Sequence, residues 1–149
     1  MSTQTAPQEQ SSEEAVQAVN QRFYAAFESF DIVEMEAVWA HDDAIECVRP
    51  DWDLLLGWHE VRECWARIFA NAKRVGIALS SIWVRVEGDV GWVACTEHAT
   101  TAFAESFDEA IVQATNIFVR RGDQWLLVLH HASPLPITSR STVQQGGPP

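Results

Sequence analysis

Apolar residues recur every three or four positions in three stretches of the first half of the chain, a pattern typical of helices with one buried face. The spacing predicts a long helix over residues 12–30, opened at Ser12 by a Ser-Glu-Glu-Ala sequence that resembles a capping box. It predicts a short helix capped by Asp31 and a third helix over residues 58–72. The predicted inward residues are Val16, Val19, Phe23, Phe27 and Phe30; Val33, Val38 and Trp39; and Trp58, Val61, Trp65, Ile68 and Phe69. Gln17, Asn20 and Gln21 are predicted to face outward.

The second half of the chain alternates apolar and polar residues and is punctuated by glycine-containing turns, which predicts β-strands. Long strands are expected at residues 76–86, 90–103, 110–120 and 124–132, after a short strand at 44–48 that Pro50 ends. Gly88 and Gly122 lie in tight turns, where glycine readily adopts a positive φ. Helices followed by a four-stranded antiparallel meander indicate the α+β class.

The last two strands bring candidate polar groups together. A two-residue loop at Gly122-Asp123 pairs Asn116 with Leu129, which places Asn116 and His131 on one face and His130 on the other. We therefore expect His131 to face the interior. A β-bulge near the histidines would reverse that assignment.

Length and composition indicate one domain, over residues 12–136, in a chain of 149 residues. Residues 1–11 and 137–149 are rich in Ser, Thr, Gln, Gly and Pro and are expected to be disordered tails. The formal net charge of -11 argues against nucleic acid and anionic membranes as partners. Three cysteines without CxxC spacing, no secretory signal and no long apolar stretch predict a cytoplasmic protein without membrane contact.

Two local motifs carry a resemblance. One is Trp-(x)5-Ile-x-Cys-Val at residues 39–48, followed by Pro50 and Gly57; the other is Thr115-Asn116 with Arg-Gly-Asp-x-Trp and His-His-x-Ser-Pro in the final hairpin. They resemble the SnoaL-like members of the nuclear transport factor 2-like superfamily. The hairpin is also similar to the association domain of calcium/calmodulin-dependent kinase, in which the position of Asn116 carries a pocket arginine and that of His131 is also histidine.

The resemblance implies a cone-shaped fold in which a curved antiparallel sheet wraps around a long N-terminal helix, the nuclear transport factor 2-like or cystatin-like roll. It also implies an apolar pocket and a homodimer formed through the outer face of the sheet. The sequence departs from related patterns in two places. Arg49-Pro50-Asp51 stands where SnoaL-like members often have His-Pro-Gly, and the base of ketosteroid isomerase falls near Val48, which cannot move a proton. Tyr24 lies in the first helix, where a donor tyrosine could sit, but the isomerase constellation is incomplete.

The candidate catalytic residues are His131 and Glu97. Glu97 shares strand parity with Val93 and Cys95, so an inward orientation would make it a buried carboxyl with a raised pKa, suited to acid–base chemistry. It could equally be a hydrogen-bond partner for a buried histidine or amide. The candidate ligand-pocket residues are Asn116, Trp39, Cys47, Trp65 and Phe118. Asn116 fits either a ligand contact or a structural polar group, and a pair of Cys47 or Cys95 with His131 would be nucleophilic.

Motifs for metals and cofactors are absent: His130 and His131 are adjacent, and no glycine-rich phosphate loop occurs. The leading hypothesis is therefore a protein that binds a small, largely apolar organic molecule. The first alternative is a cofactor-independent isomerase, dehydratase or cyclase that uses His131 or Glu97 as general acid or base. The second is a dimerisation or assembly module.

Overall fold

The computed structural model describes residues 11–136 and contains three helices and six strands within them. The helices are α1 (Ser12–Ser29), α2 (Ile32–Val38) and α3 (Trp58–Asn71). The strands are β1 (Glu46–Val48), β2 (Leu55–Leu56), β3 (Arg74–Glu87), β4 (Val90–Ala102), β5 (Phe107–Arg121) and β6 (Gln124–Pro134). Apart from Ser11, the predicted tails lie outside the described residues.

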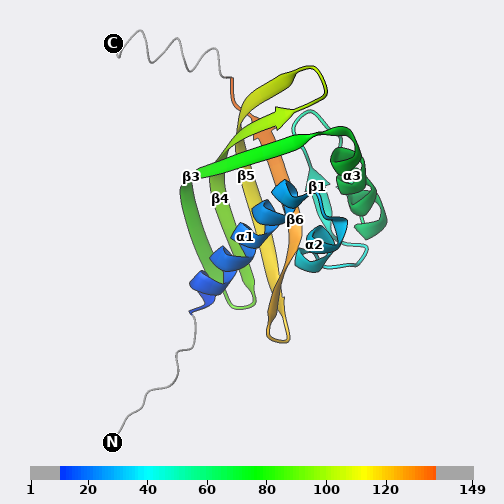
Figure 1. Cartoon of the computed structure of the whole chain (residues 1–149). Helices are drawn as coiled ribbons and strands as arrows, with labels where there is room; N and C mark the ends of the chain where they lie inside the picture. The colour runs from blue at the N-terminus through cyan, green and yellow to red at the C-terminus, as the bar shows by residue number, and fades with distance from the viewer. Residues whose placement is uncertain (1–10, 137–149) are drawn as a thin grey trace, which may run out of the picture.

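The six strands form one curved sheet in the order β2-β1-β6-β5-β4-β3. Strands β3 to β6 form the predicted antiparallel meander, which confirms the α+β class. The sheet as a whole is mixed, however, because β1 pairs in parallel with β6, with Cys47 opposite His130. Figure 1 shows α1 lying across one face of the sheet, with α2 and α3 beside it near β1. The arrangement is the expected cone around the N-terminal helix.

Helix α1 begins at Ser12, as predicted, but the serine of its capping box is Ser11 and not Ser12. The Ser11 hydroxyl accepts a hydrogen bond from the Glu14 amide at 3.1 Å, and the Glu14 carboxylate accepts one from the Ser11 amide at 3.2 Å. This reciprocal capping box satisfies two backbone donors that a helix start leaves free. The helix ends at Ser29. Phe30, predicted to be helical, is instead the C-cap residue, and its left-handed conformation with φ 59° redirects the chain toward α2.

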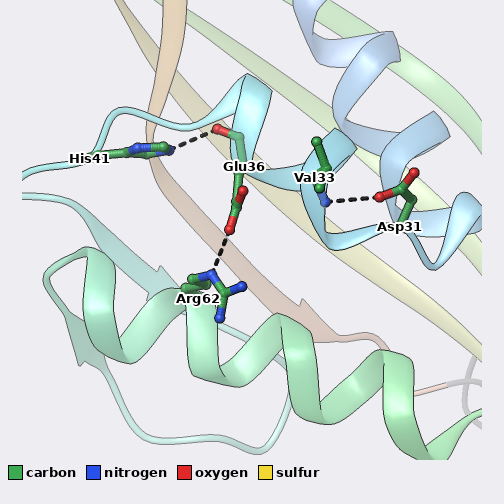
Figure 2. A network of polar contacts seen from close by, with 5 residues as sticks. All are labelled: Asp31, Val33, Glu36, His41 and Arg62. Atoms are coloured by element: carbon green, nitrogen blue, oxygen red, sulfur yellow. Dashed lines mark hydrogen bonds and ion pairs between the residues drawn. The ribbon is translucent and has the colours of Figure 1, made fainter.

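Short polar contacts fix α2 and the segment after it (Figure 2). The Asp31 carboxylate caps α2 by accepting from the Val33 amide at 2.9 Å. The Glu36 carboxylate of α2 accepts a hydrogen bond from Arg62 Nε of α3 at 2.6 Å. The ring nitrogen Nε2 of His41 lies 2.8 Å from the Glu36 carbonyl oxygen. These contacts hold α2 against α3 and set the direction in which the chain enters β1.

The interior of the cone is aromatic, and Phe23 of α1 lies at its centre. Its ring makes edge contacts with Tyr24, Phe27, Trp39 and Trp65, at centroid distances of 4.8, 6.4, 6.2 and 5.6 Å. All five side chains are buried. Edge-to-face packing of this kind adds stability beyond the area that the rings bury. It also surrounds the site described below with apolar material.

Gly91 of β4 allows α1 to approach the sheet closely. A Cβ at this position would lie 2.7 Å from Cγ2 of Val16 and 3.3 Å from Cγ1 of the same side chain. We expect Gly91→Ala to lower the free energy of unfolding by about 1–3 kcal/mol, because a branched side chain in a packed interior must then move. Urea denaturation monitored by tryptophan fluorescence measures this change.

The matched control is Gly76→Ala in β3, where a Cβ would meet no atom within 4 Å. The double variant Gly91→Ala/Val16→Ala should lose less stability than the sum of its single substitutions, since removing the Val16 methyls relieves the overlap. Additive losses would contradict the explanation by close approach.

Candidate functional site

The register of the β5–β6 hairpin decides which histidine faces the interior. Asn116 lies opposite His130, and a shift in register between Ile117 and Phe118 leaves Val128 as an extra residue in β6. The prediction that His131 faces inward is therefore wrong: the His131 side chain is exposed and that of His130 is fully buried. The bulge reverses the strand parity of every residue after it.

Asn116 is the centre of a buried polar network. Its Oδ1 lies 2.6 Å from Nδ1 of His130, and its Nδ2 donates to Oδ1 of Asn20 at 2.8 Å and to the Tyr24 hydroxyl oxygen at 3.1 Å. Asn20 was predicted to face outward, but it is fully buried. The amide thus joins α1 to both strands of the hairpin. As predicted for a buried asparagine in an apolar strand, its polar atoms are paired.

Glu97 of β4 extends the network. The sequence left its orientation open, and in the structure it faces inward, since its side chain is 1% exposed. The Tyr24 hydroxyl donates to Glu97 Oε2 at 2.6 Å, and Sγ of Cys95 lies 3.7 Å from the same hydroxyl. Burial raises the pKa of the Glu97 carboxyl, against the opposing effects of the Arg49 charge and the Tyr24 hydrogen bond. A raised pKa favours the neutral carboxyl, which can donate as well as accept a hydrogen bond.

His130 connects this network to Arg49, the residue after β1. Arg49 NH1 lies 2.8 Å from Nε2 of His130. Because a guanidinium can only donate, Nε2 must accept, and Nδ1 carries the proton that it donates to Asn116. Burial lowers the pKa of His130 well below its usual value, and the neighbouring charges of Arg49 and His131 lower it further. His130 is therefore a neutral imidazole of defined tautomer.

The network thus runs from the buried Glu97 through Tyr24, Asn116 and His130 to the half-buried Arg49. Sequence reasoning identified Glu97 and Asn116, considered Tyr24 and did not identify Asn20, His130 or Arg49 as members. One available signal was that Asn20 lies four residues before Tyr24, at the spacing of a single helix face. A second signal was Arg49 itself, which stands where SnoaL-like members often have the histidine of His-Pro-Gly.

The other predicted pocket residues lie in the packed interior. Trp39, Cys47, Trp65 and Phe118 are at most 2% exposed. Trp65 borders the network, with its ring centroid 6.2 Å from that of His130, and Cys47 lies opposite His130 in the sheet. Burial raises the pKa of the Cys47 thiol, which disfavours the thiolate that a nucleophilic cysteine requires.

Three buried polar atoms have no hydrogen-bond partner among residues 11–136. They are Asn20 Nδ2, Trp65 Nε1 and Glu97 Oε1. Buried polar atoms in native proteins are nearly always paired, and an unpaired one costs stability. Two of the three belong to residues of the network and the third lies beside it, so this interior holds more polar atoms than residues 11–136 pair by hydrogen bonds.

Comparison with known proteins agrees with this fold. The family model of the SnoaL-like domain matches residues 16–138. The chain belongs to the SnoaL-like family. A proposed dehydratase of the NTF2-like family from Streptomyces avermitilis is 34% identical to it, with a TM-score of 0.78 over 83% of this chain and 96% of the other. A proposed calcium/calmodulin-dependent protein kinase type II association domain from Thiobacillus denitrificans is also 34% identical, with a TM-score of 0.72 over 80% and 94%.

One curated relative of this SnoaL-like chain is the F-box protein SKIP8 of Arabidopsis thaliana, 22% identical over 129 residues, which are 87% of this chain. The chain spans about half the length of that relative, 53%. A ketosteroid isomerase-like protein from Erwinia carotovora atroseptica has a TM-score of 0.71 at 16% identity, over 83% of this chain and 96% of the other, and shows the shared fold alone.

Within residues 11–136 of this SnoaL-like domain, no group of three or more His, Cys, Asp or Glu side chains is placed to hold a metal ion. None of the helices in that range is long and apolar enough to cross a membrane. The chemistry available to the site is that of a buried carboxyl beside a tyrosine hydroxyl, an amide, a neutral imidazole and one guanidinium.

Proposed function

We propose that this SnoaL-like domain binds a small, largely apolar organic molecule inside the cone, with Glu97 as the orienting group and Asn116 as the amide that holds Tyr24 and His130 in place. The observation that carries the proposal is the unpaired Oε1 of the buried Glu97, next to an Oε2 that is already bonded to Tyr24. An oxygen atom of a ligand would pair with Oε1 by accepting a hydrogen bond from the neutral carboxyl. The aromatic rings around Phe23 would contact the apolar part of the ligand.

The alternative function is cofactor-independent catalysis, and the contact between Tyr24 and Glu97 favours it. Because the single hydroxyl proton of Tyr24 is donated to Glu97 Oε2, the neutral carboxyl is the donor that can stabilise negative charge developing on a ligand oxygen. Glu97 would act as general acid in an isomerisation, dehydration or cyclisation. The histidine that assists as acid or base would be His130, which is neutral and buried, and not the exposed His131. The 34% identity of this chain to a proposed dehydratase from Streptomyces avermitilis supports this alternative.

The predicted homodimer and cytoplasmic location also belong to this proposal. Large apolar side chains on β3 and the start of β4 support an interface on the sheet, since Ile82, Trp83 and Val90 are 37%, 51% and 40% exposed. Apolar groups at this density are typical of surfaces that a partner covers.

A thermal-shift screen against steroids, aromatic polyketides and terpenoids tests ligand binding. At a ligand concentration of about one hundred times Kd, binding should raise Tm by about 5–10 °C for a domain of this size. Asn116→Ala should abolish the shift, measured against the Tm of that variant without ligand. The matched control is Gln113→Ala, an exposed amide on the opposite face of β5, which should respond as the wild type does.

Incubation with the stabilising compound, followed by mass spectrometry of the products, separates the two functions. Conversion that Glu97→Gln abolishes while binding persists would establish catalysis. Binding without conversion would leave the ligand-binding function alone. If no class of compound raised Tm, or if Asn116→Ala kept the full shift, the proposed function would be wrong.

A further inference from the structure

Arg49 differs from the arginines that form ion pairs in this structure. Four arginine side chains lie within 4.0 Å of a carboxylate on the surface: Arg62 with Glu36, Arg85 with Glu87, Arg120 with Asp89 and Arg121 with Asp42. For Arg49 no carboxylate of residues 11–136 lies within that distance. The chain carries 21 acidic residues, yet none of those described pairs with this cation.

The guanidinium of Arg49 is instead held by aromatic rings and one imidazole. Its Cζ lies 5.0 Å from the ring centroid of Phe27 and 5.6 Å from that of Trp65, within the range of cation–π contact. NH1 bonds to Nε2 of His130. A guanidinium has five N–H donors in a fork that matches a carboxylate, so one hydrogen bond leaves most of that capacity unused.

The polar network does not neutralise this charge. Glu97 is its only carboxyl, and Oε2 of Glu97 already accepts from Tyr24. Burial also raises the pKa of Glu97, which favours the uncharged form. His130 is neutral. A half-buried cation without a counter-ion is costly, and the cost falls when an anion binds.

The surroundings favour an organic anion over an inorganic one. A net charge of -11 opposes the approach of any anion, so charge alone gives little affinity. An apolar hollow of about 210 Å³ lies at the C-terminal end of α3, where Arg67, Ile68 and Ala72 line it together with Trp52 and Phe103. It adjoins the turn that carries Arg49, because the Trp52 amide donates to the Arg49 carbonyl at 2.9 Å. An apolar ligand body seated in this hollow would lie beside the turn that carries Arg49.

We propose that Arg49 is the anion receptor of the ligand site and that the ligand is a small organic carboxylic acid with an apolar body. The carboxylate pairs with the free edge of the guanidinium, and the aromatic rings behind Arg49 hold the guanidinium in place. This inference rests on the proposed function, since it specifies the ligand class for the same cone.

Matched acid and amide probes test the inference by isothermal titration calorimetry. The probes are benzoate, phenylacetate and 2-naphthoate, each with its neutral amide, titrated into the whole chain. The wild type should bind at least one acid about 10- to 100-fold more tightly than its amide, the ratio expected of a charge-assisted bidentate pair. Arg49→Gln should bring that ratio close to one. Arg49→Lys should keep part of it, because lysine retains the charge without the fork.

The matched control is Arg120→Gln, which removes another arginine that lies over a tryptophan ring, 5.9 Å from the centroid of Trp125, and that does not line the hollow. It should keep the wild-type ratio of acid to amide affinity. Circular dichroism establishes that each variant is folded; if Arg49→Gln is not, a reduced ratio in the folded Arg49→Lys decides the test.

The outcomes separate this inference from the function on which it rests. Equal affinity for acid and amide, with a stabilising neutral ligand found in the thermal-shift screen, would overturn the role of Arg49 and leave the binding function standing. An unchanged ratio in Arg49→Gln would also overturn it. Failure of every acid and amide to bind the wild type, together with a negative thermal-shift screen, would overturn both.

Discussion

Phe23→Ala is expected to lower the free energy of unfolding by about 3–5 kcal/mol, the usual cost of removing a fully buried phenylalanine. The Phe23 ring is 0% exposed and contacts four other aromatic side chains as well as the ring of His130, at 5.0 Å between centroids. These rings come from α1, α3, β6 and the segment that follows α2, so they cannot collapse together into the space left behind. For a domain of this size the loss corresponds to a decrease in Tm of about 10–20 °C.

Calorimetry and urea denaturation measure the change. The control is Phe107→Ala, which removes the same ring from a position that is 59% exposed, where surface substitutions alter stability by about 0.5 kcal/mol or less. A comparable loss in both variants would show that Phe23 does not hold the core together as described.

His130→Gln is expected to become more stable relative to the wild type as the pH falls below 6.5, the ordinary pKa of histidine. In the folded protein the pKa of His130 is lowered well below that value, whereas in the unfolded chain it is not. Below pH 6.5 the unfolded state therefore binds a proton that the folded state does not, and the wild type loses stability. The difference should grow by up to about 1.4 kcal/mol per pH unit.

Glu97→Gln should give the opposite pH dependence. The folded pKa of Glu97 is raised above its ordinary value of 4.5, so above pH 4.5 the folded state holds a proton that the unfolded chain has lost. The carboxyl therefore lowers the stability of the wild type as the pH rises through this range, and removal of its charge should relieve that loss. Because the effects of His130 and Glu97 oppose one another, each is measured as a difference between variant and wild type.

Urea denaturation at a series of pH values between 4.5 and 7.5 provides both differences. His59→Gln is the matched control for histidine, since it makes the same substitution at an exposed side chain. If the His130→Gln curve ran parallel to that of the wild type, the pKa of His130 would not be lowered in the folded protein, and this explanation would be wrong.

Some features of the protein follow from sequence because they depend on neighbours along the chain. The three- and four-residue spacing of Val16, Phe23 and Phe27 predicted α1, and the glycine turns predicted the meander. Strand parity also placed Glu97 on the same face as Val93 and Cys95, which the structure confirms, because β4 contains no irregularity between Val93 and Glu97. The resemblance to SnoaL-like proteins, carried by short local motifs, was confirmed at the level of the family.

The tertiary structure decided which polar groups meet. The bulge at Val128 turned His130 inward instead of His131, because one extra residue inverts the parity of a strand and no local signal marks where the extra residue lies. The contact between Arg49 and His130 spans 81 residues and depends on the parallel pairing of β1 with β6. Asn20 is inward because it meets Asn116, 96 residues away. Periodicity separates apolar from polar faces, but it cannot show that a polar residue has a buried partner in a distant element.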